Sequence, residues 1–471
     1  MSNNLQVSWR DPSGFVLRDN GRILRAVRPD VATLLRRLFD SPWYQARVAI
    51  GSFPVSQWLS EPPNHPQANQ YAWLEHQTLH FPCYPHELTA QQLYVAAKFT
   101  IDIAREALEH GWLLKDASAW NVLFNYGKPV FCDVLSFEPW PASGIWQAYA
   151  QFCRHFIIPL LIYDHLGVQP AEMFVNHRDG ITPERAWPML KGLRAWHQPA
   201  FSAVTLPYLL ARKGKAALAS AVVRPPSTRN PELARHLLIR TFSRLEKQVE
   251  RLKPKPQRSH RGWANYESNR EHYNGVDITA KSAFVRRALG VMPGKTMLDL
   301  GCNAGEFSIL AAELGRLVVA ADFDADALAL LCDKLQQCPA DIAPMLLNVS
   351  CPSPAIGWMN REVGSFLDRA NGKFDCVLAL GLIHHLLVSE RIPLQEVLQL
   401  MLKLAPSGLI IEWIEPHDPR FTSMAGFNSV EYQHLNADTF EAVFGSHFRL
   451  VEKMRLPVCQ TRILYHWQRL L

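Results

Sequence analysis

The sequence predicts an α/β architecture with a parallel sheet for the C-terminal half and an α+β architecture for the N-terminal half. Its 471 residues exceed the size of one typical domain. From Thr296 onward, short apolar runs alternate regularly with helical stretches, which is typical of a parallel sheet with crossover helices. The first half lacks this alternation. We therefore expect one domain at residues 1–224, a basic helical connector at residues 225–261 and a second domain at residues 262–471.

Two segments of the first half have clear structural signals. Residues 14–27 contain Asp19-Asn20-Gly21, which is typical of the turn of a two-stranded hairpin. A helix is expected over residues 91–110, and a turn then leads to a strand at residues 128–133.

The connector carries more net positive charge than the chain has in total, so the rest of the chain sums to −1. The whole chain has a formal charge of +6, whereas residues 235–261 hold nine lysines and arginines against two glutamates, which is +7. A helix is expected over residues 232–253, and its basic positions form one stripe: Arg240, Arg244, Lys247 and Arg251. Such a stripe is either a solvated face or a contact surface for an acidic partner such as RNA, a nucleotide sugar or an anionic polymer.

The second half reads as a succession of strands and helices. Strands are expected at residues 296–301, 317–322, 342–348, 374–380, 408–414, 448–454 and 462–467. Helices are expected mainly at residues 307–314, 324–336, 354–370 and 394–404. Because no helix separates the last two strands, they should close the sheet as an antiparallel hairpin.

The turn after the first of these strands is the predicted ligand site. In an open α/β sheet, ligands bind beyond the carboxyl ends of the strands. Gly301 and Gly305 would let the backbone pass close to a ligand, and Asp299 stands where it can hold an amino group. Asp322 ends the second strand, where a carboxylate can accept hydrogen bonds from both ribose hydroxyls. The two glycines do not complete a GxGxxG pattern, which favours a nucleoside without a pyrophosphate.

Three segments in register now support a family resemblance. Leu298–Ser308 (LDLGCNAGEFS), Phe374–Leu386 and Pro406–Pro416 resemble motif I and the fourth- and fifth-strand motifs of class I S-adenosylmethionine-dependent methyltransferases. The resemblance covers residues 262–471 and implies a Rossmann-like, seven-stranded methyltransferase sheet that binds S-adenosylmethionine.

The resemblance implies the cofactor contacts. Asp299, Gly301 and Gly305 would line the methionine end, and Asp322 would bind the ribose. The further cofactor-binding candidates are Cys302, Asn303, Phe323, Leu380, Asn348 and Tyr273. Asn348 stands where the family often has an acidic residue near the adenine. Tyr273 belongs to an aromatic segment, residues 263–273, that either caps the cofactor together with Lys281 or is an ordinary packing helix.

The catalytic candidates follow the fourth and fifth strands. His384 and His385 would face the transferable methyl, and a histidine there could deprotonate an acceptor hydroxyl. The alternative is that one histidine packs and the other shapes the pocket, because methylation of an amine can proceed by positioning alone. Glu412 is a second candidate, and residues 418–436 are expected to form a substrate lid. No cysteine and histidine spacing predicts a metal site.

The first half contains a fragment that resembles another family. Asp116, Asn121 and Asp133 have the spacing of the catalytic loop and the metal-binding Asp of kinase-like phosphotransferases, which implies Mg·ATP. However, no lysine precedes Lys98, and no Gly-rich loop is evident. Three interpretations stay open: a degenerate kinase-like domain that scaffolds or presents substrate, an active phosphotransferase with an arginine such as Arg25 in the lysine's place, and a chance match in an unrelated fold.

The whole layout resembles bacterial methyltransferases related to the nodulation host-specificity protein, on the segment Leu114–Asn121 (LKDASAWN). We expect a methyltransferase that acts on an O or N atom of a small-molecule, glycan or nucleotide-linked acceptor. The alternatives are a bifunctional phosphotransferase–methyltransferase and a module that binds RNA or a protein partner through the basic helix.

Composition indicates where the protein works. With 48% hydrophobic and 20% charged residues, the chain is typical of soluble globular proteins. Its nine cysteines are odd in number and scattered, and the start of the sequence shows no signal peptide. The longest apolar run, residues 156–163, is too short to span a membrane. We therefore expect a cytoplasmic protein.

Overall fold

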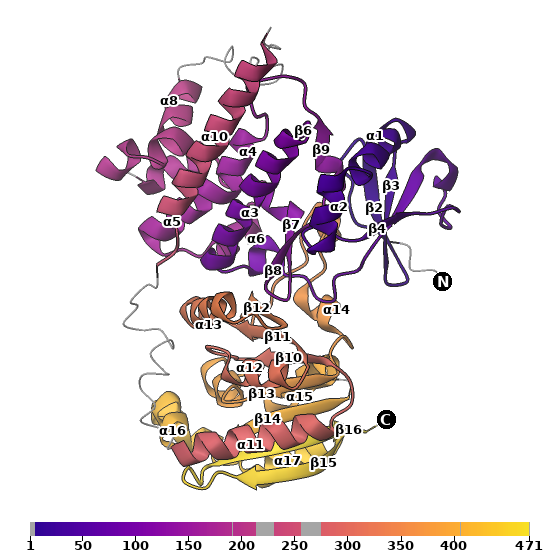
Figure 1. Cartoon of the computed structure of the whole chain (residues 1–471). Helices are drawn as coiled ribbons and strands as arrows, with labels where there is room; N and C mark the ends of the chain where they lie inside the picture. The colour runs from indigo at the N-terminus through magenta and orange to yellow at the C-terminus, as the bar shows by residue number, and fades with distance from the viewer. Residues whose placement is uncertain (1–4, 191, 213–229, 256–274, 406, 471) are drawn as a thin grey trace. The chain divides into compact units, whose positions relative to one another are not determined.

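The computed structural model describes residues 5–190, 192–212, 230–255, 275–405 and 407–470, and the chain divides into two compact units (Figure 1). Unit 1 comprises Met1–Lys255 together with Ile356–Val363, and unit 2 comprises Pro256–Ala355 and Gly364–Leu471. The parts of the predicted connector at residues 225–229 and 256–261, and the aromatic segment at residues 263–273, lie outside the described residues.

Unit 1 begins with a five-stranded antiparallel sheet in the order β1-β2-β3-β5-β4. The strands are β1 (Leu5–Gln6), β2 (Gly14–Asp19), β3 (Arg22–Val27), β4 (Ser56–Trp58) and β5 (Ala72–His76), and helices α1 (Pro29–Phe39) and α2 (Pro42–Ala49) connect β3 to β4. The predicted hairpin is confirmed as β2 and β3. Asn20 and Gly21 join them with φ values of 49° and 84°, the left-handed backbone that this tight turn requires.

The rest of unit 1 is largely helical. Helix α3 (Ala90–Glu109) begins at a capping box in which Thr89 and Gln92 satisfy each other's backbone N–H groups. Two short hairpin-like sheets follow, β6 (Trp112–Leu114) with β9 (Phe137–Pro139) and β7 (Val122–Asn125) with β8 (Lys128–Phe131). Among its described residues, the remaining α-helices are α4 (Tyr149–Phe152), α5 (Ile158–Leu166), α6 (Pro170–Asn176), α7 (Pro183–Ala186), α8 (Leu206–Arg212) and α10 (Pro231–Arg251).

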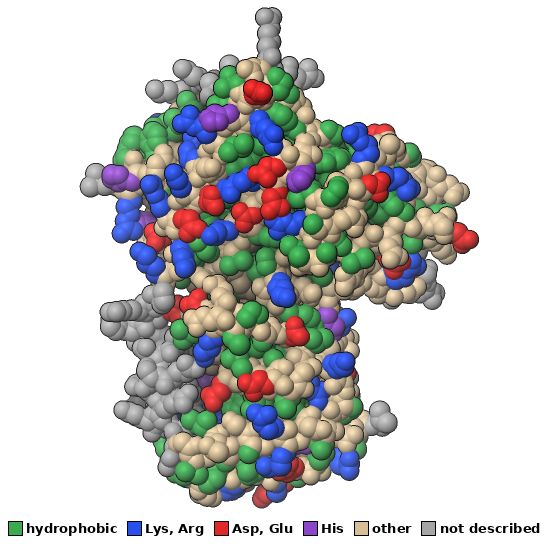
Figure 2. Space-filling view, in the orientation of Figure 1, with side chains coloured by type: hydrophobic (Ala, Val, Ile, Leu, Met, Phe, Trp, Pro, Cys, Tyr) green, Lys and Arg blue, Asp and Glu red, His purple; other side chains and the backbone are tan. Residues whose placement is uncertain are grey.

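Helix α10, which carries the predicted basic stripe, packs against α3 within unit 1. Leu238, Phe242 and Leu245 are fully buried along its apolar face. Polar contacts also tie it to α3, among them Tyr94 Oη, which donates to Glu250 at 2.9 Å, and Arg105, which donates to Glu246 at 2.6 Å. The four basic side chains of the stripe are exposed. On the face of unit 1 that Figure 2 shows, acidic and basic side chains are interspersed.

A segment of the second half, Ile356–Val363, belongs to unit 1. Ile356 and Val363 pair with each other and pack with Tyr84, and the Glu362 carboxylate forms ion pairs with Arg10 at 2.9 Å and with Arg178 at 2.7 Å. The predicted helix over residues 354–370 is therefore wrong for most of its length. Gly357, Met359 and Asn360 have positive φ values, which an α-helix excludes, and only α14 (Phe366–Ala370) is α-helical.

Unit 2 contains one mixed sheet of seven strands in the order β12-β11-β10-β13-β14-β16-β15. The strands are β10 (Thr296–Leu300), β11 (Leu317–Asp322), β12 (Ile342–Leu346), β13 (Cys376–Ala379), β14 (Gly408–Ile414), β15 (Phe448–Arg455) and β16 (Arg462–Arg469). The first five are parallel, and β16 runs antiparallel between β14 and β15. The predicted α/β sheet with its antiparallel closing hairpin is thus confirmed, as is the Rossmann-like order of its parallel strands.

Helices cover both faces of this sheet (Figure 1). They are α11 (Gly275–Val291), α12 (Glu306–Glu313), α13 (Ala325–Gln337), α14, α15 (Leu394–Leu404), α16 (Pro419–Ala425) and α17 (Ala437–Gly445). Strands β13 and β14 are buried along their whole length, as expected for central strands covered on both faces. In the part of the chain that the structure describes, none of the helices combines the length and apolar character needed to cross a bilayer.

Candidate active site

A cavity of about 470 Å³ opens at the carboxyl ends of β10, β11, β12 and β13 in unit 2. Strand order reverses between β10 and β13, and this is where an open α/β sheet forms its ligand crevice. Ten residues predicted for the site line this cavity: Asp299, Gly301, Cys302, Asn303, Asp322, Phe323, Asn348, Leu380, His384 and His385. Tyr273 lies outside the described residues.

The two glycines of the first turn have different roles. Gly301 lines the cavity and has a φ of 73°, so the turn requires a residue that tolerates left-handed backbone. Gly305 does not belong to the described lining. A Cβ atom at Gly305 would lie 2.4 Å from the Leu331 side chain, so this glycine permits the start of α12 to pack against α13. Its φ of 79° and this close packing both account for a glycine at position 305, and its predicted contact with the cofactor stays a prediction.

Asp299 is a carboxyl group on the buried floor of the cavity. Asp299 is only 3% exposed, and its Oδ2 accepts a hydrogen bond from Ser308 Oγ at 2.6 Å. Burial raises the pKa of Asp299 to about 7, and the nearby carboxylate of Asp322 acts in the same direction, although the Ser308 hydrogen bond opposes it. A cation bound beside Asp299 would favour its ionised form.

Asp322 ends β11 and faces the same cavity. Backbone N–H groups hold both carboxylate oxygens: Asn303 donates to Oδ2 at 2.7 Å, and Asp324 donates to Oδ1 at 2.8 Å. Burial raises the pKa of Asp322, and these backbone donors oppose the shift. Each oxygen retains a further lone pair, so a ligand with two neighbouring hydroxyls can donate to this carboxylate.

Three of the predicted residues follow the carboxyl ends of three strands: Phe323 follows β11, Asn348 follows β12 and Leu380 follows β13. Phe323 is 58% exposed and offers a ring face next to Asp322. Asn348 uses its amide oxygen inside its own loop, where Ser350 donates from its N–H at 3.0 Å and its hydroxyl at 2.7 Å. Leu380 adds apolar surface. This wall is therefore suited to a flat, weakly polar group.

A buried ion pair lies beside the cavity. Lys281 of α11 lines the cavity and donates from Nζ to Glu412 Oε2 at 2.8 Å, and Glu412 has 0% exposure. Glu412 itself is not among the described residues that line the cavity. The structure therefore places this predicted catalytic residue as the partner of Lys281, which fixes α11 against β14.

His384 and His385 follow β13, and both line the cavity. Their ring centroids lie 4.1 Å apart. His384 is 3% exposed, and neither of its ring nitrogens has a hydrogen-bond partner among the described residues. Burial, together with the neighbouring His385 and Arg462, lowers the pKa of His384 to about 2, so the ring is neutral. A buried neutral imidazole without partners is a group that a ligand can satisfy.

Sequence reasoning missed the cationic side chains near these histidines. Arg420 and Arg462 both line the cavity, and Arg462 forms a buried ion pair with Asp418 at 3.0 Å. Arg462 begins β16 and reaches this place because β16 pairs antiparallel with β14, where Arg462 stands opposite Ile414. The predicted reversal of the last strands was the available signal. Ser308, the partner of Asp299, was part of the first motif but was not singled out.

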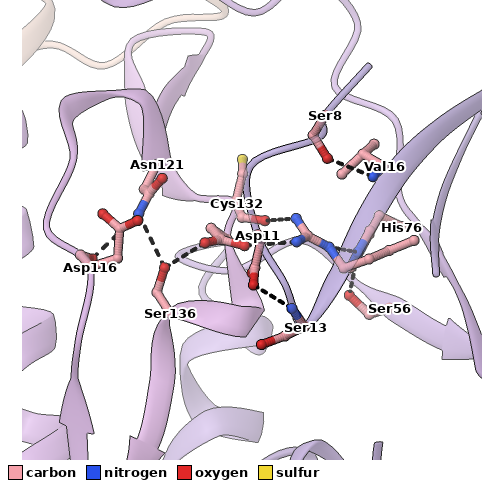
Figure 3. Close-up of polar contacts among 12 residues, drawn as sticks. Ser8, Asp11, Ser13, Val16, Ser56, His76, Asp116, Asn121, Cys132 and Ser136 are labelled. Atoms are coloured by element: carbon pink, nitrogen blue, oxygen red, sulfur yellow. Dashed lines mark hydrogen bonds and ion pairs between the residues drawn. The ribbon is translucent and has the colours of Figure 1, made fainter. Parts of the chain in front are cut away.

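The predicted phosphotransferase residues come together in unit 1 (Figure 3). Asn121 Nδ2 donates to the Asp116 carbonyl oxygen at 3.4 Å and to Ser136 Oγ at 3.1 Å. Ser136 Oγ donates to Asp133 Oδ2 at 2.5 Å, and Arg25 donates to Asp133 Oδ1 at 2.7 Å. Because the positive charge of Arg25 already compensates Asp133, and Ser136 donates to its second oxygen, these residues do not fit a Mg²⁺ site. Among the described residues, no group of three or more His, Cys, Asp or Glu side chains could hold a metal ion.

This chain resembles known proteins over its whole length and, more distantly, in the motifs of unit 2. No family model matches it. Over 467 residues, the chain is 28% identical to the nodulation protein NoeA of Rhizobium meliloti (strain 1021), and the match covers 98% of this chain and 95% of NoeA. The resemblance to nodulation-related proteins is thus confirmed over nearly the whole chain. Unit 2 resembles class I S-adenosylmethionine-dependent methyltransferases, because the three motifs fall on β10, β13 and β14 of one sheet.

Solved structures give weaker similarities. The N-methyltransferase NodS from Bradyrhizobium japonicum WM9 is 14% identical, with 42% of this chain and 98% of NodS covered and a TM-score of 0.31. The magnesium protoporphyrin IX methyltransferase ChlM from Synechocystis PCC 6803 is 18% identical, with 41% and 81% covered and a TM-score of 0.30. The bifunctional kinase-methyltransferase WbdD is 20% identical, with 41% and 38% covered and a TM-score of 0.30. Such TM-scores carry no argument, so the fold assignment rests on strand order.

Proposed function

We propose that the protein is an S-adenosylmethionine-dependent methyltransferase that moves a methyl group to an O or N atom of an acceptor. The observation that carries the proposal is the pair of buried carboxyl groups, Asp299 and Asp322, which end neighbouring strands and face one cavity. Together they favour a ligand that offers both hydroxyl donors and positive charge. S-adenosylmethionine has a ribose diol, an ammonium group and a sulfonium centre, so the residues present fit it.

The residues of this chain would hold the two ends of the cofactor separately. Asp322 accepts hydrogen bonds from the ribose hydroxyls, and its backbone donors keep the carboxylate in place. Asp299 holds the amino group, with Ser308 fixing its orientation. Phe323 and Leu380 cover the nucleobase. When bound, the cofactor supplies a methyl group activated by the positive charge on sulfur.

We propose that His384 contacts the acceptor. The ring is neutral and held by burial, so one nitrogen donates a hydrogen bond and the other accepts one. A hydroxyl or amine placed against the accepting nitrogen is oriented with its lone pair toward the methyl group, which is the larger part of what this reaction requires. His385 shapes the same wall. Glu412 acts through Lys281 as a positioning residue.

Unit 1 would present or scaffold the acceptor as a phosphotransferase-like unit. Its sheet, the helices between β3 and β4, and the clustered Asp116, Asn121 and Asp133 support this relation, whereas the Arg25 ion pair disfavours phosphoryl transfer. The acceptor would be a small molecule, a glycan or a nucleotide-linked intermediate. We place the activity in the cytoplasm, on the cysteine usage of the sequence.

Calorimetric titration of the full chain with S-adenosylmethionine tests the proposal. We expect one site per chain in the wild type and an affinity about 10- to 100-fold lower in Asp322→Ala, because hydrogen bonds to a charged group contribute about 1.5–3 kcal/mol. Asp341→Asn is the matched control. It also removes one aspartate charge, but Asp341 is exposed and precedes the amino end of β12, so the affinity should not change.

Two results would contradict the proposal. If the wild type shows no binding, or if Asp322→Ala and Asp341→Asn bind with the wild-type affinity, the cavity is not the cofactor site.

A further inference from the structure

Arg25 is held in unit 1 by three protein acceptors. It lies on β3, and its side chain is largely buried. Nε donates to His76 Nε2 at 3.2 Å, one terminal nitrogen donates to Asp133 Oδ1 at 2.7 Å, and the other donates to the Cys132 carbonyl oxygen at 3.3 Å (Figure 3). Because every nitrogen of the guanidinium has an acceptor in the protein, its position is fixed from three directions.

The acceptors of Arg25 are fixed in turn. His76 Nδ1 lies 2.7 Å from Ser56 Oγ, and burial together with the Arg25 charge lowers the pKa of His76 to about 3. The imidazole is therefore neutral and can accept from Arg25. Asp133 is the carboxylate that balances the guanidinium, and Ser136 holds its second oxygen at 2.5 Å. The charge of Asp133 is thus compensated by the chain itself, and Asp116 is a second carboxyl group nearby, whose pKa is raised by burial and by the Asp133 charge.

The amide of Asn121 is also directed inward. Its nitrogen donates to Ser136 Oγ, which donates to Asp133, so the three side chains form one hydrogen-bonded series that ends on Arg25. A divalent cation prefers carboxylate and carbonyl oxygens, and it would have to displace both partners of Asp133. It would also stand within a few ångströms of the guanidinium, where repulsion between like charges is strong in a partly buried site.

We propose that the Arg25 guanidinium takes the place of a divalent cation in this cluster, so that unit 1 keeps a phosphotransferase-like arrangement of Asp116, Asn121 and Asp133 without binding Mg·nucleotide there. The cluster acts as a polar core of unit 1 whose cation is supplied by β3. The sequence-based alternative, in which Arg25 binds nucleotide phosphates in a lysine's place, would require the guanidinium to leave three acceptors at once.

Removal of the guanidinium should convert the cluster into a cation site. In the full chain, Arg25→Met removes the charge partner of the Asp133 carboxylate. The methionine side chain is similar in length to the arginine side chain that it replaces. We expect Mn²⁺, followed by its paramagnetic resonance signal, to bind Arg25→Met at least tenfold more tightly than the wild type, with a dissociation constant on the order of 1 mM or below. Arg25→Met/Asp133→Asn should lose this binding.

Arg22→Met is the matched control. Arg22 lies on the same strand and pairs with a carboxylate, Glu75, at 2.6 Å, but that pair is exposed. Loss of Arg22 should create no Mn²⁺ site. The control therefore separates a prepared site from the simple loss of one positive charge on β3.

Two results would overturn the proposal. One is Mn²⁺ or Mg·ATP binding by the wild type that Asp133→Asn abolishes. The other is a folded Arg25→Met chain, judged by circular dichroism, that binds Mn²⁺ no better than Arg22→Met. If Arg25→Met does not fold, the wild-type and Asp133→Asn titrations decide alone: absence of Asp133-dependent binding supports the proposal, and its presence overturns it.

Discussion

The two units treat buried carboxylates in opposite ways. In unit 2, Asp299 and Asp322 face a cavity of about 470 Å³, and burial raises the pKa of both carboxyl groups. In unit 1, Asp133 is ion-paired with Arg25 at 2.7 Å and hydrogen-bonded to Ser136. One unit leaves its carboxyl groups for a ligand to compensate, whereas the other supplies the cation from its own chain.

The two groups of carboxyl residues occupy similar places in their units, but they differ in their partners. Asp299 and Asp322 lie at the carboxyl ends of β10 and β11, and Asp116 and Asp133 follow β6 and β8. Both groups of residues resemble the functional motifs of enzyme families. Residue identity alone therefore does not distinguish a site prepared for a ligand from one that the protein has already satisfied. The partners of each carboxylate make the distinction, because an uncompensated buried charge is costly until something binds it.

The largest expected effect concerns the internal ion pair of unit 2, Lys281 with Glu412. We expect this pair to be structural, like the pair of Arg25 and Asp133 in unit 1. Glu412→Ala then leaves a buried ammonium group without its carboxylate, so the free energy of unfolding of unit 2 should fall by about 3–5 kcal/mol. Hydrogen exchange of the amides of β13 and β14 measures this unit specifically.

The exposed pair of Arg287 and Glu452, at 2.7 Å, provides the control. Glu452→Ala also removes one glutamate from one ion pair, yet the loss should be below about 1 kcal/mol because solvent screens the pair. Equal effects of the two substitutions would mean that Lys281 and Glu412 do not form a structural pair.

A smaller effect is expected where packing rather than a ligand explains a glycine. In Gly305→Ala the new methyl group would lie 2.4 Å from Leu331, whereas Gly315 has the same φ of 79° and nothing within 4 Å. Gly315→Ala should cost about 1 kcal/mol from backbone strain alone, and Gly305→Ala about 1–3 kcal/mol more from overpacking. Thermal unfolding measures both, and Leu331→Ala should relieve part of the second cost. Equal costs at the two glycines would show that the contact with Leu331 does not matter.

The sequence was most informative where structure is local. Residues 317–321 and 409–411 are continuous apolar runs, and β11 and β14 include them. The first motif also brings Asp299 and Gly301 to one turn, since its spacing is short. By contrast, Arg462 reaches the cavity through the antiparallel pairing of β16, and Arg25 meets Asp133 across 108 positions. Such contacts depend on tertiary packing that no local pattern encodes. The helix expected at residues 354–370 failed because Ile356–Val363 packs within unit 1.

The central claim is that the carboxyl groups of unit 2 await a cationic ligand, and Asp299 tests it through pH. Its pKa in the empty cavity is about 7, so at pH 6 the group is mostly protonated. A bound ammonium group lowers that pKa, so binding releases a proton below pH 7 and the affinity rises with pH up to the free pKa.

Calorimetric titration with S-adenosylmethionine at pH 6 and pH 7.5 is the most direct measurement. We expect an affinity about eightfold higher at pH 7.5 in the wild type, for a bound-state pKa well below 6. Asp299→Asn cannot ionise, so it should bind more weakly and with the same affinity at both pH values. The account would be contradicted if the wild type did not bind S-adenosylmethionine, or if its affinity were the same at the two pH values.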